Sequence, residues 1–312
     1  MAHLSRSESQ PSLPEDLQQA TADPPFHDQE AGADIILRTS DGVDFYTHKT
    51  ILCLVSPFFK TMFQLPQPAN SALVVDVPET SRILGIILRA SYPFGSSISR
   101  FQELGDIEQV LEAALKYDMD AMVSVARRRL LNQCPLRMFV LGCRLNREDI
   151  CQSAATTLLS HRLQSLDSEV LHRISGHQYH ILTQWHSRCC EAASNAVSTR
   201  SWFTPCGVLK KTPGCDCWVQ DSRSQDWYAP TCVWQYLEDA RNVVASCPSS
   251  KAAVRKSILR PLIAWSTARN GCATTTARAD YWGSVHYLAK TLLALAVDRA
   301  VAEIPMPKFC DE

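Results

Sequence analysis

Residues 34–63 have the sequence DIILRTSDGVDFYTHKTILCLVSPFFKTMF, and this stretch decides the fold of the N-terminal part of the chain. Its first half carries apolar residues in strand-like alternation around Asp41-Gly42, a strong hairpin-turn pair because glycine accepts a positive φ at no steric cost. In its second half the apolar residues recur at helical spacing. Ser56-Pro57 divides this half, since serine is a good N-cap and proline fits the first position of a helix. We therefore expect a hairpin that runs into two short helices.

The chain after this stretch supplies the other elements of one domain. Alternating apolar residues over 73–77 predict a third strand. Helical apolar spacing then follows in three segments, whose expected capping residues are Thr80, Asp106 and Asp120. Residues 31–132 are therefore predicted to form an α+β domain with a three-stranded sheet and about five helices.

At these residues the sequence resembles the BTB/POZ domain family. The likeness consists of Asp34 opening the first strand, Phe45, His48-Lys49 at the strand-to-helix junction, Ser56-Pro57-Phe58-Phe59 and Met62-Phe63. The order of strands and helices over residues 31–132 matches as well. The family is a protein–protein interaction fold, so the resemblance implies a binding module without catalysis.

The resemblance also implies two functional surfaces. Several BTB domains dimerise through their first helix and N-terminal segment, and in this sequence that surface consists of Thr50, Ile51, Cys53, Leu54 and Phe58. The charged pocket pair of the family falls on Asp34 and Lys49. A structural alternative exists for Asp34, because a hairpin-to-helix junction needs side chains that satisfy backbone groups in any protein.

A third surface would decide which partner the domain recruits. Some BTB proteins bind a cullin-type ubiquitin-ligase scaffold and carry a hydrophobic-x-acidic triplet before the penultimate helix. Phe101-Gln102-Glu103 fits that pattern, so a substrate-recruiting adaptor of a cullin ligase is an alternative to a self-associating scaffold or adaptor. A BTB-containing transcriptional regulator is a further alternative, although no zinc-finger array or basic DNA-binding region supports it.

Composition limits the classes of partner. The chain has 312 residues, enough for about two domains, with 46% hydrophobic and 20% charged residues and a formal net charge of −1. A nucleic-acid or anionic-membrane binder would need a basic field, so we expect protein partners and neither nucleic acid nor membrane. No apolar run approaches the ~18 residues of a membrane span.

The N-terminal segment and the cysteines indicate the cellular compartment. Residues 1–30 are polar and hold one aromatic residue, so they are predicted to be a disordered tail. They also lack the apolar stretch of a signal peptide. The thirteen cysteines are therefore expected to be thiols in a reducing compartment, the cytoplasm or the nucleus.

Residues 133–312 are predicted to be mainly helical. Residues 133–197 show helical apolar spacing, with Ser175 as the N-cap of a long helix, and many BTB proteins continue into a helical extension of this kind. Residues 198–312 are expected to form an all-α C-terminal domain, interrupted near its start by a loop rich in cysteine and tryptophan.

That loop contains candidate metal ligands. Cys206, Cys215 and Cys217 could bind Zn²⁺, because thiolates suit a tetrahedral zinc site. Cys272 is the preferred fourth ligand, and the substitutes are Cys190, Cys232 and His186. The alternative is a tryptophan-rich loop with free thiols.

The same region resembles fungal, basidiomycete-type BTB proteins with a helical C-terminal region that contains cysteine and tryptophan. Those proteins tend to carry Trp-Phe-Thr-Cys and a later cysteine pair. Here Trp202-Phe203-Thr204 is followed by Pro205 before Cys206, and the later pair is reduced to Cys272. No phosphate loop, metalloprotease helix, nucleophile elbow or kinase motif set occurs. We therefore predict that the protein is not an enzyme, and a structural zinc is the one cofactor for which the sequence offers candidate ligands.

Overall fold

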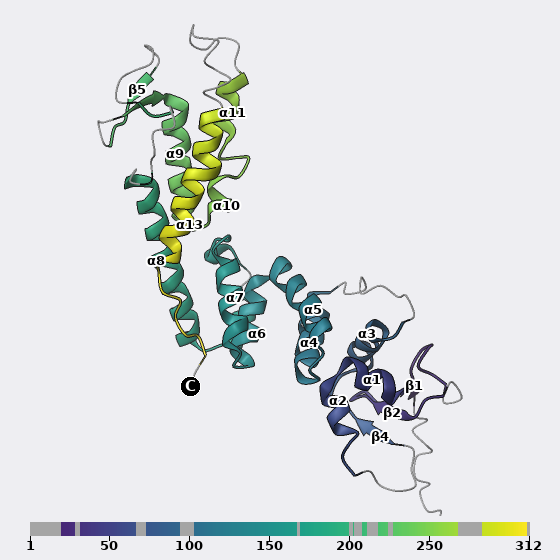
Figure 1. Ribbon diagram of the computed structural model, residues 1–312. Coiled ribbons are helices and arrows are strands. Elements are labelled where there is room, and N and C mark those ends of the chain that lie inside the picture. The colour runs from purple at the N-terminus through teal and green to yellow at the C-terminus, as the bar shows by residue number, and fades with distance from the viewer. Residues whose placement is uncertain are drawn as a thin grey trace, which may run out of the picture. The chain divides into compact units, whose positions relative to one another are not determined.

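The computed structural model (Figure 1) describes residues 20–28, 32–66, 73–93, 103–166, 169–199, 202, 208–210, 218–223, 227–267 and 283–310, with the backbone alone for 264–267. The chain divides into two compact units, Met1–Leu130 and Leu131–Glu312. The N-terminal unit combines a small sheet with helices, and the C-terminal unit consists mainly of helices.

The sheet of the N-terminal unit has four strands in the order β1-β3-β2-β4. The strands are β1 (Ala20–Thr21), β2 (Ile35–Arg38), β3 (Val43–Thr47) and β4 (Val74–Asp76). The β2–β3 pair is antiparallel, whereas β1 joins β3 and β4 joins β2 in parallel. The expected hairpin and third strand are therefore present, with β1 added at one edge.

The hairpin follows from its sequence. Gly42 takes a φ of +79° in the turn, a backbone conformation that glycine adopts at no steric cost. Ile35 and Leu37 alternate inward on β2 and are buried. On the paired positions Arg38 and Asp44 the two side chains form a bidentate ion pair, with N···O distances of 2.8 and 3.0 Å. This pair compensates the charge of Asp44, which is buried.

Five helices complete the described part of this unit. They are α1 (Lys49–Val55), α2 (Pro57–Met62), α3 (Ser81–Ser91), α4 (Leu104–Lys116) and α5 (Asp120–Gln133), the last of which extends past the unit boundary. Ser56 caps α2 as expected, since its Oγ accepts the backbone N–H of Phe59 at 3.1 Å.

The expectation of a disordered tail over residues 1–30 needs a correction for residues 20–28. Phe26 is 1% exposed and lies against the rings of Phe45 and Tyr92, with centroid distances of 6.0 and 5.0 Å. The backbone oxygen of Phe26 also accepts the N–H of Tyr46 at 3.0 Å. One aromatic side chain with a core site of its own is sufficient to anchor a short polar segment.

The C-terminal unit is built from helices of varied length. They are α6 (Pro135–Arg144), α7 (Glu148–Leu158), the short 3-10 helices η3 (Leu163–Ser165) and η4 (Glu169–Arg173), α8 (Gly176–Thr199), α9 (Thr231–Val244), α10 (Ser250–Ala253), α11 (Arg260–Thr267), the π-helical η5 (Leu288–Leu293) and α13 (Ala294–Ala302). The strands β5 (Trp218–Gln220) and β6 (Tyr228–Pro230) form a small antiparallel sheet.

Local signals and close packing position these helices. Ser175 and Gln178 form a reciprocal capping box at the start of α8, with both hydrogen bonds at 3.1 Å. The α6–α7 pair is close because Gly142 has no side chain: a Cβ there would lie 2.7 Å from Cys151 Sγ and 2.9 Å from its backbone nitrogen. Residues of α8, α9, η5 and α13 share one buried core that includes Val197, Tyr236 and Leu293.

The predicted fold class is confirmed: an α+β unit with a small sheet precedes a helical C-terminal region. The β5–β6 sheet is an element that the sequence analysis did not expect, and it lies in the stretch predicted to be a loop. Among the described residues, no helix combines the length and apolar character needed to cross a membrane.

Candidate functional site

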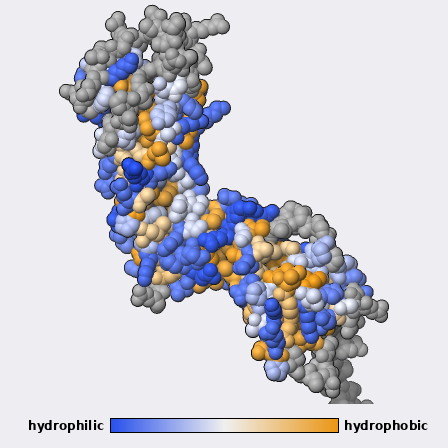
Figure 2. Space-filling view, in the orientation of Figure 1, coloured by the Kyte–Doolittle hydropathy of each residue, from blue (hydrophilic) through white to orange (hydrophobic). Residues whose placement is uncertain are grey.

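An apolar surface on α1 and the start of α2 is the main candidate site. Leu54 is 84% exposed and Phe58 is 38% exposed, although both side chains are large and hydrophobic. Thr50 is exposed beside them, while Ile51 and Cys53 are half-buried. Apolar side chains, drawn in orange, gather on the part of this unit where α1 lies (Figure 2). We call the five residues the α1–α2 surface.

The helices that carry the α1–α2 surface pack against the core of the unit on their other side. Leu52 and Phe59 point into the core and are 1% and 3% exposed. The ring of Phe59 stacks on Tyr117 at a centroid distance of 5.0 Å, and the ring of Phe58 lies 5.5 Å from Tyr117. Ser56 Oγ donates to the Tyr117 backbone oxygen at 2.5 Å. These contacts fix the start of α2, so the exposed side chains are presented on a rigid support.

Asp34 and Lys49 meet through the backbone. The Asp34 carboxylate accepts the Lys49 backbone N–H at 2.7 Å, at the first residue of α1. The Lys49 ammonium lies 5.9 Å from the centroid of the Phe63 ring, and no ion pair joins the two charged side chains in the described structure. Asp34 therefore acts as a helix cap supplied by the segment before β2, which is the structural alternative considered for it. The charged pocket stays a prediction.

The predicted cullin-contact residues are described only in part. Phe101 lies outside the described residues, and Glu103 is the exposed N-cap residue of α4. Asp106, the expected cap, lies instead in the first turn of α4 and is buried. Arg82 pairs with both carboxylates, at 3.1 Å for Glu103 and 2.7 Å for Asp106. The pKa of Arg82 is raised by these hydrogen bonds, first by the one to Asp106.

The four preferred zinc ligands, Cys206, Cys215, Cys217 and Cys272, all lie outside the described residues. Of the substitutes, His186 and Cys190 lie one turn apart on α8, with Nδ1 and Sγ 3.5 Å apart. Burial raises the pKa of Cys190 to about 12 and that of Cys232 to about 11, which disfavours the thiolates that zinc requires. Within the described ranges, no group of three or more His, Cys, Asp or Glu residues could hold a metal ion. The zinc site stays a prediction.

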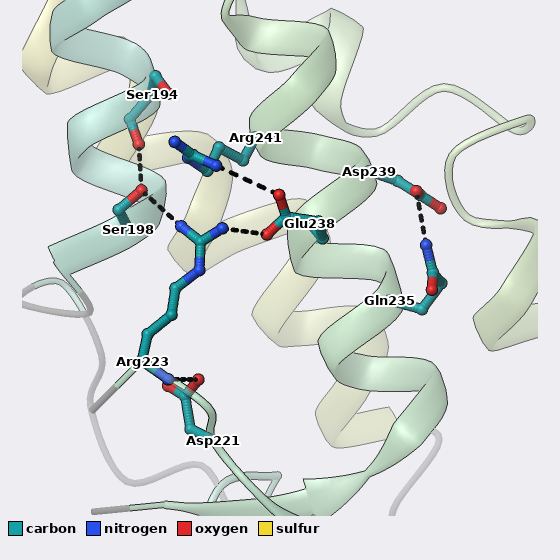
Figure 3. Close-up of polar contacts among 8 residues, drawn as sticks. All are labelled: Ser194, Ser198, Asp221, Arg223, Gln235, Glu238, Asp239 and Arg241. Carbon is teal, nitrogen blue, oxygen red and sulfur yellow. Dashed lines mark hydrogen bonds and ion pairs between the residues drawn. The ribbon is translucent and has the colours of Figure 1, made fainter. Parts of the chain in front are cut away.

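A cluster of polar side chains joins α8, α9 and the turn after β5 (Figure 3). The Arg223 guanidinium pairs with Glu238 and also reaches Ser198 Oγ at 3.5 Å. Arg241 donates to the other oxygen of Glu238 at 3.2 Å, and Asp221 accepts the Arg223 backbone N–H at 3.1 Å. The side chains of Arg223, Glu238 and Arg241 are more than one third exposed, so their ion pairs contribute little stability. We infer that the cluster has a structural role: it joins the turn between β5 and β6 to α8 and α9.

The C-terminal segment is docked on the helices of its unit, a feature that the sequence patterns did not predict. Phe309 is 1% exposed and packs edge-on against Phe139 and Trp185, with centroid distances of 5.1 and 6.4 Å. The Glu148 carboxylate accepts the backbone N–H groups of Phe309 and Cys310, both at 3.0 Å. In Figure 1 this segment, in yellow, runs alongside α8. A large aromatic residue after Pro305 and Pro307 was the one available signal.

Three thiols meet where this segment ends. Cys151 Sγ lies 3.7 Å from Cys143 Sγ and 3.7 Å from Cys310 Sγ. Burial, together with Cys151 and Glu148 nearby, raises the pKa of Cys310 to about 12. The hydrogen bond with Cys143, together with burial, also raises the pKa of Cys151. Cys151 and Cys310 are therefore neutral thiols near pH 7, which suits packing and disfavours nucleophilic chemistry.

Residues 25–133 match the family model described as the BTB/POZ domain. No curated protein matches the chain. The predicted BTB domain is therefore confirmed, and with it a protein-interaction module in the N-terminal part of the chain. The likeness to fungal BTB proteins stays a prediction.

Proposed function

We propose that the protein is an interaction scaffold or adaptor that self-associates through the α1–α2 surface. The exposure of Leu54, 84% on a helix whose other face packs on the core, is the observation that carries the proposal. The matched domain family supports it, because a BTB domain implies protein partners and often dimerisation. The helical C-terminal unit would then be available to bind a second protein partner.

Energetic considerations support burial of this surface against a second copy. Fully burying a leucine or phenylalanine side chain stabilises by about 1.5–3 kcal/mol. Leu54 would gain nearly all of that, and Phe58 a part. A stable interface buries roughly 1,600 Å² in total, so the two side chains would form its centre and neighbouring residues its rim. In a two-fold dimer the same surface of each copy would meet.

Self-association can be tested by sedimentation velocity over a range of protein concentrations. We expect the unmutated protein to dimerise and Leu54→Glu to raise the dissociation constant at least tenfold. Leu295→Glu is the matched control, because Leu295 is 63% exposed in the C-terminal unit and undergoes the same chemical change. If the unmutated protein stays monomeric at about 50 μM, or if both variants weaken association equally, self-association through the α1–α2 surface is wrong.

Recruitment of a cullin-type ligase scaffold is the second candidate. Glu103 supports cullin recruitment, because its side chain is 69% exposed at the start of α4, where an acidic contact residue would be accessible. A pull-down with cullin should succeed with the unmutated protein and fail with Phe101→Ala and with Glu103→Lys. Absence of cullin binding by the unmutated protein would exclude this function and leave the self-association test unaffected.

A further inference from the structure

The docked C-terminal segment places a partly exposed thiol against a buried one. Cys310 follows Phe309 in this segment and is partly exposed, whereas Cys151 lies on α7 and is 0% exposed. Their Sγ atoms are 3.7 Å apart, although the two residues are 159 positions apart in the chain. The sulfur atoms are in van der Waals contact, and they would have to approach by about 1.7 Å to form a disulfide bond.

The residues around Cys310 hold its thiol in this position. The Glu148 carboxylate accepts the backbone N–H groups of Phe309 and Cys310, both at 3.0 Å. The Phe309 ring packs against Phe139 and Trp185. Three helices, α6, α7 and α8, therefore contribute to positioning the segment. Two thiols fixed side by side in this way have a higher effective concentration than two thiols in an unfolded chain.

Cys143 on α6 also lies 3.7 Å from Cys151 Sγ, but it is less suited to a disulfide. Cys143 is buried, so a small-molecule oxidant reaches Cys310 more easily. The helices α6 and α7 are already in tight contact at Gly142, where a Cβ would lie 2.9 Å from the Cys151 backbone nitrogen. Cys310, in contrast, lies outside any helix, so its backbone can adjust to bring the sulfur atoms together.

We propose that Cys151 and Cys310 form a reversible disulfide, with a low-molecular-weight disulfide such as glutathione disulfide as the oxidant. The Cys310 sulfur, after losing its proton, attacks one sulfur of glutathione disulfide. The S–S bond of that molecule breaks, and one glutathione leaves and takes up a proton. The Cys151 sulfur, after losing its proton, then attacks the Cys310 sulfur and releases the second glutathione as a thiol. Two protein thiols are thus oxidised, and one glutathione disulfide is reduced to two thiols.

The raised pKa values of the two thiols make this exchange slow while the segment is docked. Burial raises the pKa of Cys310 to about 12, and the hydrogen bond with Cys143 raises the pKa of Cys151, so little thiolate is present. Brief release of the segment exposes Cys310 to the oxidant, and renewed docking returns it to Cys151. The pair therefore responds to lasting changes in the ratio of glutathione to its disulfide.

The disulfide would fasten the C-terminal segment to α7. A cross-link between residues 159 positions apart removes many conformations from the unfolded chain, so it stabilises the folded unit. The oxidised protein would keep the segment docked, whereas the reduced protein could release it. The docking of the segment would accordingly follow the redox state of the compartment.

The test measures this disulfide in the full chain by mass spectrometry. The protein is equilibrated at about pH 8.5 with mixtures of glutathione and glutathione disulfide, in native buffer and in concentrated urea, and the remaining thiols are alkylated. Trypsin places the thiols of Cys143, Cys151 and Cys310 on three peptides, 138–144, 148–162 and 309–312. We expect a disulfide between the last two peptides, with an effective concentration of the two thiols at least tenfold higher in native buffer than in urea. Equal values in both solutions, glutathione on Cys310 alone, or a disulfide between Cys143 and Cys151 would each overturn the proposal.

Two serine variants complete the test. Cys310→Ser should remove the disulfide, and Cys134→Ser should retain it. Cys134 is the matched control, because it is also a partly exposed thiol of the C-terminal unit but makes no thiol contact in the described structure. The oxidised protein should melt at least about 5 °C above the reduced protein, a difference that Cys310→Ser should abolish. Loss of the disulfide in both variants, or an equal Tm for the oxidised and reduced protein, would contradict the fastening of the segment.

Discussion

The Asp41 carboxylate, in the turn between β2 and β3, holds the start of α3 by accepting both the backbone N–H and the hydroxyl of Ser81, at 2.9 and 2.6 Å. Thr80 is the N-cap residue of this helix but makes no side-chain cap bond. Asp41 therefore caps a helix that begins forty residues later in the chain. The hairpin turn thus fixes α3 in addition to reversing the chain.

Replacing Asp41 should lower stability by an amount that depends on pH. Burial raises the pKa of Asp41, but hydrogen bonds from Ser81 and Thr39 outweigh it, and the net pKa is lowered. The stabilising effect is therefore present above the unfolded-state pKa of about 4 and is lost as pH falls through the lower folded-state pKa. We expect Asp41→Asn to cost about 1 kcal/mol at pH 7 and less at pH 3.

Urea titrations at several pH values would measure this difference. Asp23→Asn serves as the control, because Asp23 is exposed and its side chain caps no helix in the described structure. A stability difference between Asp41→Asn and the unmutated protein that does not shrink in acid would contradict the capping role.

Gly142→Ala should destabilise the C-terminal unit by about 1–3 kcal/mol, because the added methyl group would meet the backbone nitrogen of Cys151 at 2.9 Å. The helices α6 and α7 would have to move apart to relieve this contact. Gly105→Ala on α4 is the matched control, since its Cβ would meet nothing within 4 Å, and it should be neutral or slightly stabilising. Calorimetric unfolding of both variants gives the comparison; an unchanged transition in Gly142→Ala would show that the helix pair is not tightly packed.

Ser56→Ala should cost about 2–3 kcal/mol, because one buried hydroxyl makes two hydrogen bonds. It caps α2 through the Phe59 N–H and satisfies the Tyr117 carbonyl. Ser124→Ala, at an exposed position on α5, should change stability by less than about 0.5 kcal/mol. Chemical denaturation would measure both, and similar values for the two variants would refute the role of Ser56.

Phe309→Ala should release the C-terminal segment and expose the thiols beneath it. The substitution removes the ring that packs on Phe139 and Trp185, so reaction of Cys310 with a disulfide reagent should accelerate at least tenfold. In the unmutated protein that reaction is slow because burial raises the pKa of Cys310 to about 12. Met306→Ala, at a position 36% exposed, should leave the rate nearly unchanged. Equal rates in Phe309→Ala and the unmutated protein would show that Phe309 does not hold the segment.

The parts of the fold that depend on neighbouring residues were predictable from the sequence. The Asp41-Gly42 turn, the Ser56 cap of α2 and the Ser175 cap of α8 all involve residues close together in the chain, and all three are confirmed. The exposure of Leu54 was not predictable, because helical spacing alone does not tell whether an apolar residue faces the core or a partner.

The contacts that the sequence analysis missed join distant residues. Phe26 packs on Tyr92, Asp41 caps α3, and Glu148 binds the backbone at Phe309. None of these pairs has a periodicity or spacing that local patterns record. The same reason applies to the three thiols that meet where the C-terminal segment ends.

Asp34 connects two properties of the N-terminal domain, the predicted charged pocket and self-association, that mutations would otherwise be expected to affect separately. Because its carboxylate holds the first residue of α1, a substitution at Asp34 disturbs the helix that carries Leu54. A variant designed to probe a charged pocket would therefore also weaken self-association. We expect mutations at Asp34 and Leu54 to be epistatic: in a protein already carrying Leu54→Glu, the loss of Asp34 should change the oligomeric state no further.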